Sequence, residues 1–422
     1  MVPYTKEEAA RLGMPNLRML VCPRRGDRKK RARDLVPGIV DALTRPLTED
    51  ERITKTVIPE IPPRIAMTGT YDEIQDFFIG KLERSEIFAP YSRWTDGLPI
   101  IPPTKEKVAE MLKGTSHAPD EVFPKPMMPS MWEFTVEKVA VNGVMAGCKP
   151  EYMPVLLAMA EAMSDEKGSG TLTTTMGFAY MSVVSGAIAK EIGMNWGENF
   201  LNPGNPANAT LGRAMRLMFI NLGNFIPPNM TATHGHPANY SCCFAENIWD
   251  SPWAPLGEDF GFKPKENTIS IFYTMNSYNE MFLATHIYRY YRLLLPLIPD
   301  VLRSFDLPRS FGLILIPTLA KDLYERGFKT KNDVKKWIWD NTTELWGERK
   351  IRQWGTKGPR DFPIDIARQT GYPHWRDIPD HAIIHLPARL DTIHIIVAGG
   401  EDEFGLAMNL NYCATASIDK WK

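Results

Sequence analysis

The chain has 422 residues, with 49 Lys and Arg against 50 Asp and Glu and a formal net charge of −1. This length is enough for two or more domains with a sizeable core, and the balanced charge excludes the electrostatic signature of a nucleic-acid-binding protein, despite a basic run at 24–33. No stretch of about 18 apolar residues is free of charge, so we expect neither a transmembrane helix nor a membrane partner.

The N-terminal sequence and the cysteine content indicate a cytoplasmic protein. The first residues, MVPYTKEEAARLG, carry charges where a secretory signal peptide needs an apolar core. The five Cys, an odd number, fit a reducing compartment better than a disulfide framework.

The first 50 residues predict a small α/β fragment. Residues 5–12 favour a short helix, 17–22 (LRMLVC) an apolar strand, and 28–44 a helix whose apolar side chains recur at helical spacing. One strand and two helices cannot bury a core alone. We therefore predict that 1–50 form a βα fragment that docks on the main body or is completed by a partner chain.

The rest of the chain predicts a linker followed by a large α/β domain. Residues 51–84 contain a double Pro and are typical of a linker and docking segment, which leaves 85–422 as the main domain that carries the site. Predicted strands are 136–145, 171–184, 267–275, 311–317, 393–399 and 404–410. Predicted helices are 105–112 with Thr104 as its N-cap, 150–163, 187–192, 205–221, 280–297, 318–327 and one from Asp333. This alternation predicts an α/β fold with mixed, largely parallel sheets and flanking helices.

One stretch, 202–253, is dense in Gly, Pro, Asn, His and Cys. Such residues build fixed loops whose backbone and amide groups point at a ligand, so we interpret the stretch as the wall of a small-molecule site. Its Asn residues suit a substrate carbonyl or carboxylate, although Asn also caps helices, and Asp96 in WTDGLP is equally suited to fix its loop as an Asx turn. The candidate substrate-binding residues are Asn205, Asn208, Asp96, Asn142, Cys242, His236 and Trp253.

Gly399 and Gly400 follow a predicted strand, and glycine there lets a ligand approach the backbone closely. No GxGxxG, P-loop, GxSxG or HExxH motif occurs in the sequence. No cofactor is therefore evident from motifs.

Three residues are candidates for catalysis: Cys148, Glu246 and His234. Cys148 lies between a predicted strand and a predicted helix, where the field of a helix N-terminus lowers a thiol pKa and favours the thiolate; the alternative is a buried structural Cys. Glu246 lies in the apolar setting CCFAENIW, where desolvation raises a carboxyl pKa and suits acid–base work. Its alternative is a salt bridge to an Arg such as Arg213. His234 is expected to orient the substrate.

A transition-metal site is the alternative for the same stretch. His234 and His236 are two residues apart, which places both on one face of a strand, and Cys242 and Glu246 follow. These four side chains have the donor chemistry that zinc and related metals prefer. The set matches no strong metal-binding spacing, so a hydrogen-bonding role for the His residues is favoured over a metal.

Four segments of the chain carry a family resemblance: TDGLPIIPPT, VEKVAVNGVMAGCKPEYMPVLLA, NPGNPANATLGRAMRL and YSCCFAENIWDSPWAPL. In these the chain resembles a bacterial family, the long domain found with UGSC-motif (seleno)proteins, over most of residues 85–400. The small domain of that family carries a Cys- or selenocysteine-Gly-Ser-Cys motif, and the segment from LGMPNLRMLVC to ALTRPL resembles the closing βα part of that domain. The motif itself is absent from this sequence, and the tail from Glu401, with Cys413, departs from the family pattern.

The resemblance implies that a partner polypeptide carries the Cys/Sec-Gly-Ser-Cys motif and that this chain is one subunit of a hetero-oligomer. The leading hypothesis is therefore a subunit of a cysteine-dependent enzyme, an oxidoreductase or lyase, that acts on a small organic molecule with thiol or selenol chemistry supplied largely by the partner. The alternatives are a metal-dependent lyase, hydratase or hydrolase that uses His234, His236, Cys242 and Glu246, and a non-catalytic substrate-binding subunit.

Overall fold

The structure is a computed structural model that describes residues 9–10, 13–20, 27–53, 65–79, 94–165, 178–226, 235–275, 294–304, 310–354, 363–401 and 405–422. The chain divides into two units, Met1–Thr70 and Tyr71–Lys422. The boundary falls inside the predicted linker 51–84, so the second unit begins before residue 85. None of the helices in the described ranges is long and apolar enough to cross a lipid bilayer.

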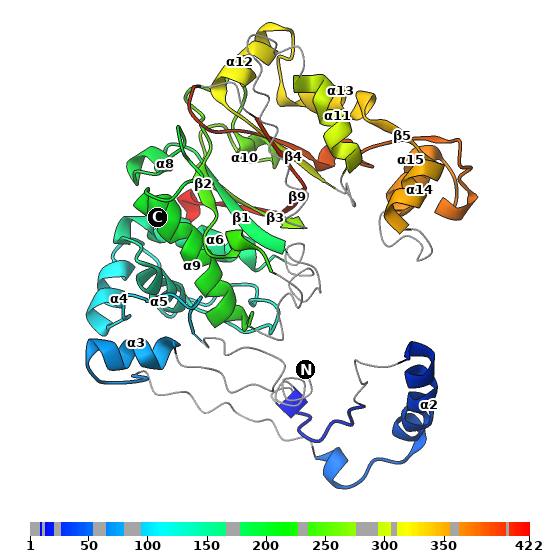
Figure 1. Ribbon diagram of the computed structural model, residues 1–422. Helices are drawn as coiled ribbons and strands as arrows, with labels where there is room; N and C mark the ends of the chain where they lie inside the picture. The colour runs from blue at the N-terminus through cyan, green and yellow to red at the C-terminus, as the bar shows by residue number, and fades with distance from the viewer. Residues whose placement is uncertain are drawn as a thin grey trace. The chain divides into compact units, whose positions relative to one another are not determined.

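The N-terminal unit is built around helix α2 (Arg28–Thr44), which has the predicted bounds (Figure 1). Its N-cap is Asp27, whose carboxylate accepts a hydrogen bond from the Lys30 amide at 2.7 Å. The predicted strand at 17–22 is wrong for residues 17–20, which have no regular structure, while 21–22 lie outside the described residues. A strand needs a neighbour to satisfy its backbone groups, and the described part of this unit offers none.

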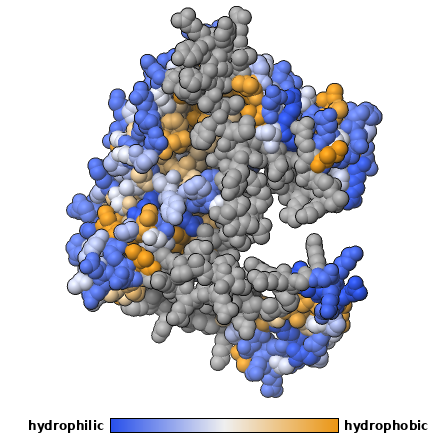
Figure 2. Space-filling model, viewed as in Figure 1, coloured by the Kyte–Doolittle hydropathy of each residue, from blue (hydrophilic) through white to orange (hydrophobic). Residues whose placement is uncertain are grey.

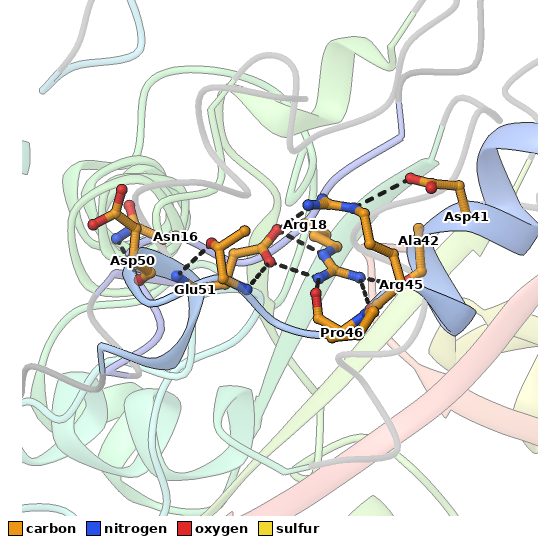
Figure 3. Close-up of polar contacts among 9 residues, drawn as sticks. Asn16, Arg18, Asp41, Ala42, Arg45, Pro46, Asp50 and Glu51 are labelled. Carbon is orange, nitrogen blue, oxygen red and sulfur yellow. Dashed lines mark hydrogen bonds and ion pairs between the residues drawn. The ribbon is translucent and has the colours of Figure 1, made fainter.

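Arg18 ties the loop before α2 to the end of that helix (Figure 3). Its guanidinium forms two hydrogen bonds of 2.6 Å with the Glu51 carboxylate. It also donates to the carbonyls of Ala42, Arg45 and Pro46 at 2.7–2.9 Å. The hydrogen bond from Arg18 lowers the pKa of Glu51 to about 2. The last carbonyls of a helix lack intrahelical donors, and the Arg18 guanidinium supplies donors to them at the C-terminus of α2.

The second unit contains a four-stranded sheet in the order β2-β1-β3-β9. Its strands are β1 (Phe178–Ser185), β2 (Cys243–Ala245), β3 (Thr268–Met275) and β9 (Leu410–Ser417). β1 pairs in parallel with β2, whereas β1–β3 and β3–β9 are antiparallel, with a register shift at Ile271/Phe272. The C-terminal tail from Glu401 thus supplies a strand of the sheet.

A three-stranded sheet in the order β7-β4-β8 lies next to it. Its strands are β4 (Phe311–Leu315), β7 (Ile393–Val397) and β8 (Gly405–Met408). β4–β7 is parallel and β4–β8 antiparallel. A short antiparallel pair, β5 (Thr343–Leu345) with β6 (Ile383–His385), packs with α14 (Trp346–Trp354) and α15 (Pro363–Thr370) around its own small core.

Helices cover the outer faces of the two larger sheets (Figure 1). The four-stranded sheet is covered by α6 (Met153–Met163) and α9 (Pro206–Gly223), while α5 (Val136–Ala146) packs on these two helices and α4 (Lys105–Leu112) packs on α5. The three-stranded sheet is covered by α11 (Leu294–Ser304), α12 (Pro317–Glu325) and α13 (Lys331–Asn341). The remaining helices of the described part are α3 (Tyr71–Ile79), α8 (Ile188–Glu191) and α10 (Leu256–Asp259).

The alternation of side chains along each strand explains this layering. In β1, Tyr180 and Val184 join the core under the helices, whereas Met181 and Val183 face the second sheet. Because neighbouring strand residues point to opposite faces, a strand buried on both sides is apolar throughout. The predicted α/β class is confirmed. Among the described strands, however, two pairings are parallel and four antiparallel, so pairing is not largely parallel there.

The predicted strand at 136–145 is wrong, because these residues form helix α5. Thr135 caps it by accepting from the Lys138 amide at 3.4 Å, and Gly147, with φ of 90°, ends it. The helix is buried on nearly every side between α4, α6 and α9, so it has no polar face. A short apolar run without a polar face has the same sequence pattern as a buried strand, and the caps alone distinguish the two.

Candidate functional site

Three segments far apart in the sequence meet at one place: helix α9, the WTDGLP loop at 94–99 and the AGC turn at 146–148. We call this place the thiol junction. Arg213 on α9 holds both oxygens of Asp96, with Nε to Oδ2 at 2.9 Å and a second nitrogen to Oδ1 at 3.0 Å, and the Asp96 side chain is almost fully buried. The same guanidinium donates to the Pro99 carbonyl at 2.7 Å. Asp96 also accepts from the Leu98 amide at 3.2 Å, so the expected Asx turn is present. The WTDGLP loop is thereby fixed to the first half of α9.

The AGC turn completes this junction. Cys148 is half-buried, directly after Gly147, and its side chain interacts with Thr210 on α9. A Cβ at Gly147 would lie 3.6 Å from the Thr210 methyl group and 3.6 Å from Ile101, so the turn packs against both α9 and residue 101, which follows the WTDGLPI segment. Helix α9, which belongs to the stretch 202–253, therefore contacts both the AGC turn and the WTDGLP loop.

The described residues around Cys148 do not activate its thiol. Because the preceding element is a helix, Cys148 follows a helix C-terminus, and only the short 3-10 helix Pro150–Tyr152 stands between it and α6. Desolvation raises the pKa of Cys148 to about 12, which outweighs the hydrogen bond with Thr210 and the charge of Arg213. Cys148 is therefore a protonated thiol, contrary to the expected lowering of its pKa.

Cys243 is a second thiol at the junction. It is buried in β2, and desolvation raises its pKa to about 12. Repulsion between the two thiolate forms also raises the pKa of Cys148, which places the two thiols near each other. Gly212 on α9 allows this approach, since a Cβ there would lie 2.4 Å from Ser241 Oγ and 2.7 Å from the Cys242 amide nitrogen. Cys242, the predicted substrate contact, is half-buried and packs toward the core between the two sheets instead.

Two of the three predicted Asn ligands, Asn205 and Asn208, hold loop backbone. Asn205 is the N-cap of α9, accepting from the Asn208 amide at 3.0 Å, and it donates to the Gly193 carbonyl at 2.9 Å. Asn208 is buried and bridges the Asn195 amide and carbonyl at 3.0 and 2.9 Å, and it donates to the Phe200 carbonyl at 3.2 Å. Both side chains therefore hold backbone groups of the 193–200 segment.

Asn142 lies inside α5 and is buried. Its amide donates to the Lys138 carbonyl at 2.9 Å and accepts from Asn221 of α9 at 2.8 Å. Asn221 in turn donates to the Trp94 carbonyl at 3.1 Å. The pair joins α5, α9 and the start of the WTDGLP loop, which is a positioning role.

Glu246 is fully buried, and both of its carboxylate oxygens have hydrogen-bond partners. Oε1 pairs with Lys331 Nζ at 3.0 Å, and Oε2 accepts from Ser185 Oγ at 2.5 Å and from the Leu256 amide at 2.7 Å. The partner is Lys331 rather than Arg213, because Arg213 is engaged by Asp96. A carboxylate without exposed surface has no access to a substrate, so this geometry favours a structural role over the predicted acid–base role.

The remaining predicted residues lie apart from the junction or outside the described part. Trp253 is in the core of the three-stranded sheet and donates to the Phe328 carbonyl at 2.9 Å. His236 is buried and accepts from the Ala238 amide at 3.0 Å, while His234 lies outside the described residues. Among the described residues, no group of three His, Cys, Asp or Glu side chains is arranged to hold a metal ion.

A cavity of about 470 Å³ lies elsewhere in the second unit. It is lined by Glu198, Asn199, Phe200, Leu201, Asn202, Ile316, Gly399, Gly400 and Glu401. Two features singled out in the sequence, Asn202 and the Gly399-Gly400 pair, thus come together. Glu198, Phe200 and Glu401 were not predicted, and neither was Thr210 at the thiol junction. Their positions depend on the packing of loops onto strand ends, for which the sequence holds no motif.

Comparisons of the chain with protein-family models, with curated proteins and with solved structures each find no match.

Proposed function

We propose that this chain is one subunit of a heteromeric enzyme that acts on a small organic molecule, with the reactive thiol or selenol supplied by a partner subunit. The observation that carries the proposal is the junction of the AGC turn, the WTDGLP loop and α9, which gathers Cys148, Thr210 and the Asp96–Arg213 pair. Pre-positioned polar groups around a half-buried thiol are typical of a substrate-orienting surface.

The protonated state of three thiols, Cys148, Cys243 and Cys413, supports a partner as the source of the nucleophile. A thiolate, not a thiol, attacks or reduces a substrate, and a pKa of about 12 for Cys148 and Cys243 leaves almost no thiolate at neutral pH. Cys413 is buried as well, and desolvation raises its pKa further. In this proposal Thr210 and Arg213 orient the substrate, and Cys148 packs against it or acts as a second thiol once a substrate has bound.

An exposed apolar stripe on α2 supports a partner-binding role for the N-terminal unit. Val36, Ile39, Val40 and Leu43 recur at helical spacing, and Leu43 is 81% exposed. Figure 2 shows hydrophobic residues among hydrophilic ones on one face of the molecule. A contiguous apolar stripe at the surface marks a site of protein–protein contact. The resemblance of this segment to the closing part of a UGSC-type small domain agrees with this role.

The interface is tested by purifying the tagged full-length chain from its native host and identifying the chains that accompany it. We expect a stoichiometric partner with a Cys/Sec-Gly-Ser-Cys motif, which Val40→Lys and Leu43→Lys each release. Asp34→Lys places the same side chain on the opposite, exposed face of α2 and is expected to retain the partner. A partner that lacks the motif, or one held equally by all three variants, would contradict the proposal.

A further inference from the structure

We propose that the cavity lined by residues 198–202, Ile316 and 399–401 is a binding site for an organic cation of the alkylammonium class. This proposal goes beyond the proposed function, because the cavity includes neither Cys148 and Thr210 nor the Asp96–Arg213 pair of the thiol junction. Its volume of about 470 Å³ lies in the range of small-molecule sites, roughly 300–1,000 Å³.

The charge of the lining selects a cation. Glu198 and Glu401 both face the cavity, and none of the described residues that line it is Lys, Arg or His. Within the described part of the chain, neither carboxylate forms an ion pair. A hollow lined by charges of one sign focuses the field and concentrates counter-ions of the opposite sign.

The apolar part of the lining selects an organic cation over a hydrated metal ion. Phe200, Leu201 and Ile316 form this part. A metal ion prefers a full set of oxygen ligands, to which these side chains contribute nothing. A short alkyl chain with an ammonium head instead places its apolar body against these residues and its charge beside the two carboxylates. The aromatic ring of Phe200 adds a surface that attracts cations.

The position in the fold is that of a ligand site in an α/β sheet. Ile316 directly follows β4, and Gly399 lies just beyond the end of β7, its parallel neighbour. β4 leads straight into α12 (Figure 1). Ligands of open α/β sheets bind outside the carboxyl ends of parallel strands, because the loops that follow diverge there.

The two glycines are required for the shape of the cavity. A Cβ at Gly400 would lie 2.1 Å from Glu198 Cγ, and one at Gly399 would lie 2.7 Å from Ile316 Cγ2. Gly399 also has a φ of 111°, which other residues rarely adopt. Only glycine therefore lets the Glu198 loop approach the strand end so closely.

The loop that carries Glu198 is held before any ligand arrives. The Gly399 amide donates to the Trp196 carbonyl at 2.8 Å, and Asn208 donates to the Phe200 carbonyl at 3.2 Å. Asn202 donates to Asn199 Oδ1 at 2.9 Å within the loop. A preformed site loses less conformational entropy on binding than one that must be ordered by its ligand.

The proposal is tested by titrating the full-length protein with butylammonium chloride, with butanol and butyrate as neutral and anionic isosteres and calcium chloride as a metal arm. Calorimetry and ligand-observed saturation-transfer NMR report binding. We expect butylammonium to bind, Glu198→Gln with Glu401→Gln to weaken it about tenfold, and higher salt to weaken it as well. Glu191→Gln, which removes an exposed carboxylate outside the cavity, is expected to leave the affinity unchanged.

A second variant separates charge from shape. Gly400→Ala places a methyl group against Glu198 and is expected to reduce butylammonium binding while thermal unfolding reports an intact fold. Equal binding of butanol and butylammonium, binding of calcium alone, or no binding of butylammonium to the wild-type protein would each overturn the proposal.

Discussion

Arg213 and Asp96 are 117 residues apart in the sequence, yet Arg213 binds both oxygens of the Asp96 carboxylate, at 2.9 and 3.0 Å. The Arg213 side chain is 18% exposed and that of Asp96 2% exposed. The pair thus joins α9 to the WTDGLP loop in a largely desolvated setting, where geometry decides whether an ion pair stabilises the fold.

Replacing Arg213 with Ala is expected to destabilise the second unit by about 3 kcal/mol, because it leaves the Asp96 carboxylate buried without its partner. Arg213→Lys keeps the charge but loses the two-pronged geometry, so an intermediate loss is expected. Urea unfolding at neutral pH measures both. Equal stability of wild-type and Arg213→Ala protein would show that the ion pair does not hold the loop.

Replacing Glu246 with Gln is expected to cost about 3 kcal/mol of unfolding free energy, since the buried Lys331 ammonium loses its counter-charge. Lys331 is also the first residue of α13, where a cation opposes the helix dipole. The double variant Glu246→Gln/Lys331→Met is expected to regain part of the loss. A Glu246→Gln protein of wild-type stability but without turnover would instead support the acid–base role.

Cys148 is expected to react slowly with iodoacetamide. With a pKa of about 12 its thiolate fraction at pH 8 is about a thousandth of that of an unperturbed cysteine, whose pKa is about 8.5. Mass spectrometry of tryptic peptides after timed alkylation measures the rate, and urea-unfolded protein is the control. Labelling of Cys148 in the folded chain as fast as in the unfolded chain would contradict the protonated state.

His394 gives the fold a defined dependence on pH. Desolvation, aided by Lys335, lowers its pKa to about 3 from an ordinary value near 6.5, among the rings of Phe272 and Tyr412. Between about pH 6.5 and pH 3 the unfolded chain therefore holds a proton here that the folded chain lacks, so stability falls as the pH falls through this window.

His394→Phe removes this contribution. The unfolding free energy of the variant is expected to fall less steeply with decreasing pH than that of the wild-type protein. The two slopes differ by up to about 1.4 kcal/mol per pH unit, the value for one proton. Urea titrations of both proteins between pH 7.5 and pH 4.5 provide the comparison. If the unfolding free energy depended on pH with the same slope in both proteins, the pKa of His394 would be the same in the folded and the unfolded chain.

Much of the fold could be predicted from local sequence patterns. Helix α2 has the expected bounds, Thr104 caps α4 as expected, and β7 follows the apolar run that predicted it. These elements carry their own signals, either a cap or a periodic apolar face. α5 shows the limit, because a helix without a polar face and a buried strand share one pattern.

The candidate site was predictable only in part. The Asx turn at Asp96 followed from the local sequence, whereas the packing of the WTDGLP loop and the AGC turn against α9 did not. The partners of individual charges did not follow, since Asp96 and Lys331 lie 117 and 85 residues from the groups they bind. The cavity at 198–202 and 399–401 depends on the close approach that Gly400 allows, which is a property of packing rather than of a motif.

The proposed role of a partner's thiol at the thiol junction is tested most directly by disulfide trapping in the native complex. Thr210→Cys in a Cys148→Ser background places a cysteine at the junction, and Lys113→Cys, exposed on the C-cap of α4, is the matched control. After mild oxidation we predict a mixed disulfide or selenenylsulfide between position 210 and the partner's Cys/Sec-Gly-Ser-Cys motif, and none from position 113. Equal cross-linking from both positions, or none from position 210 in an intact complex, would contradict the account.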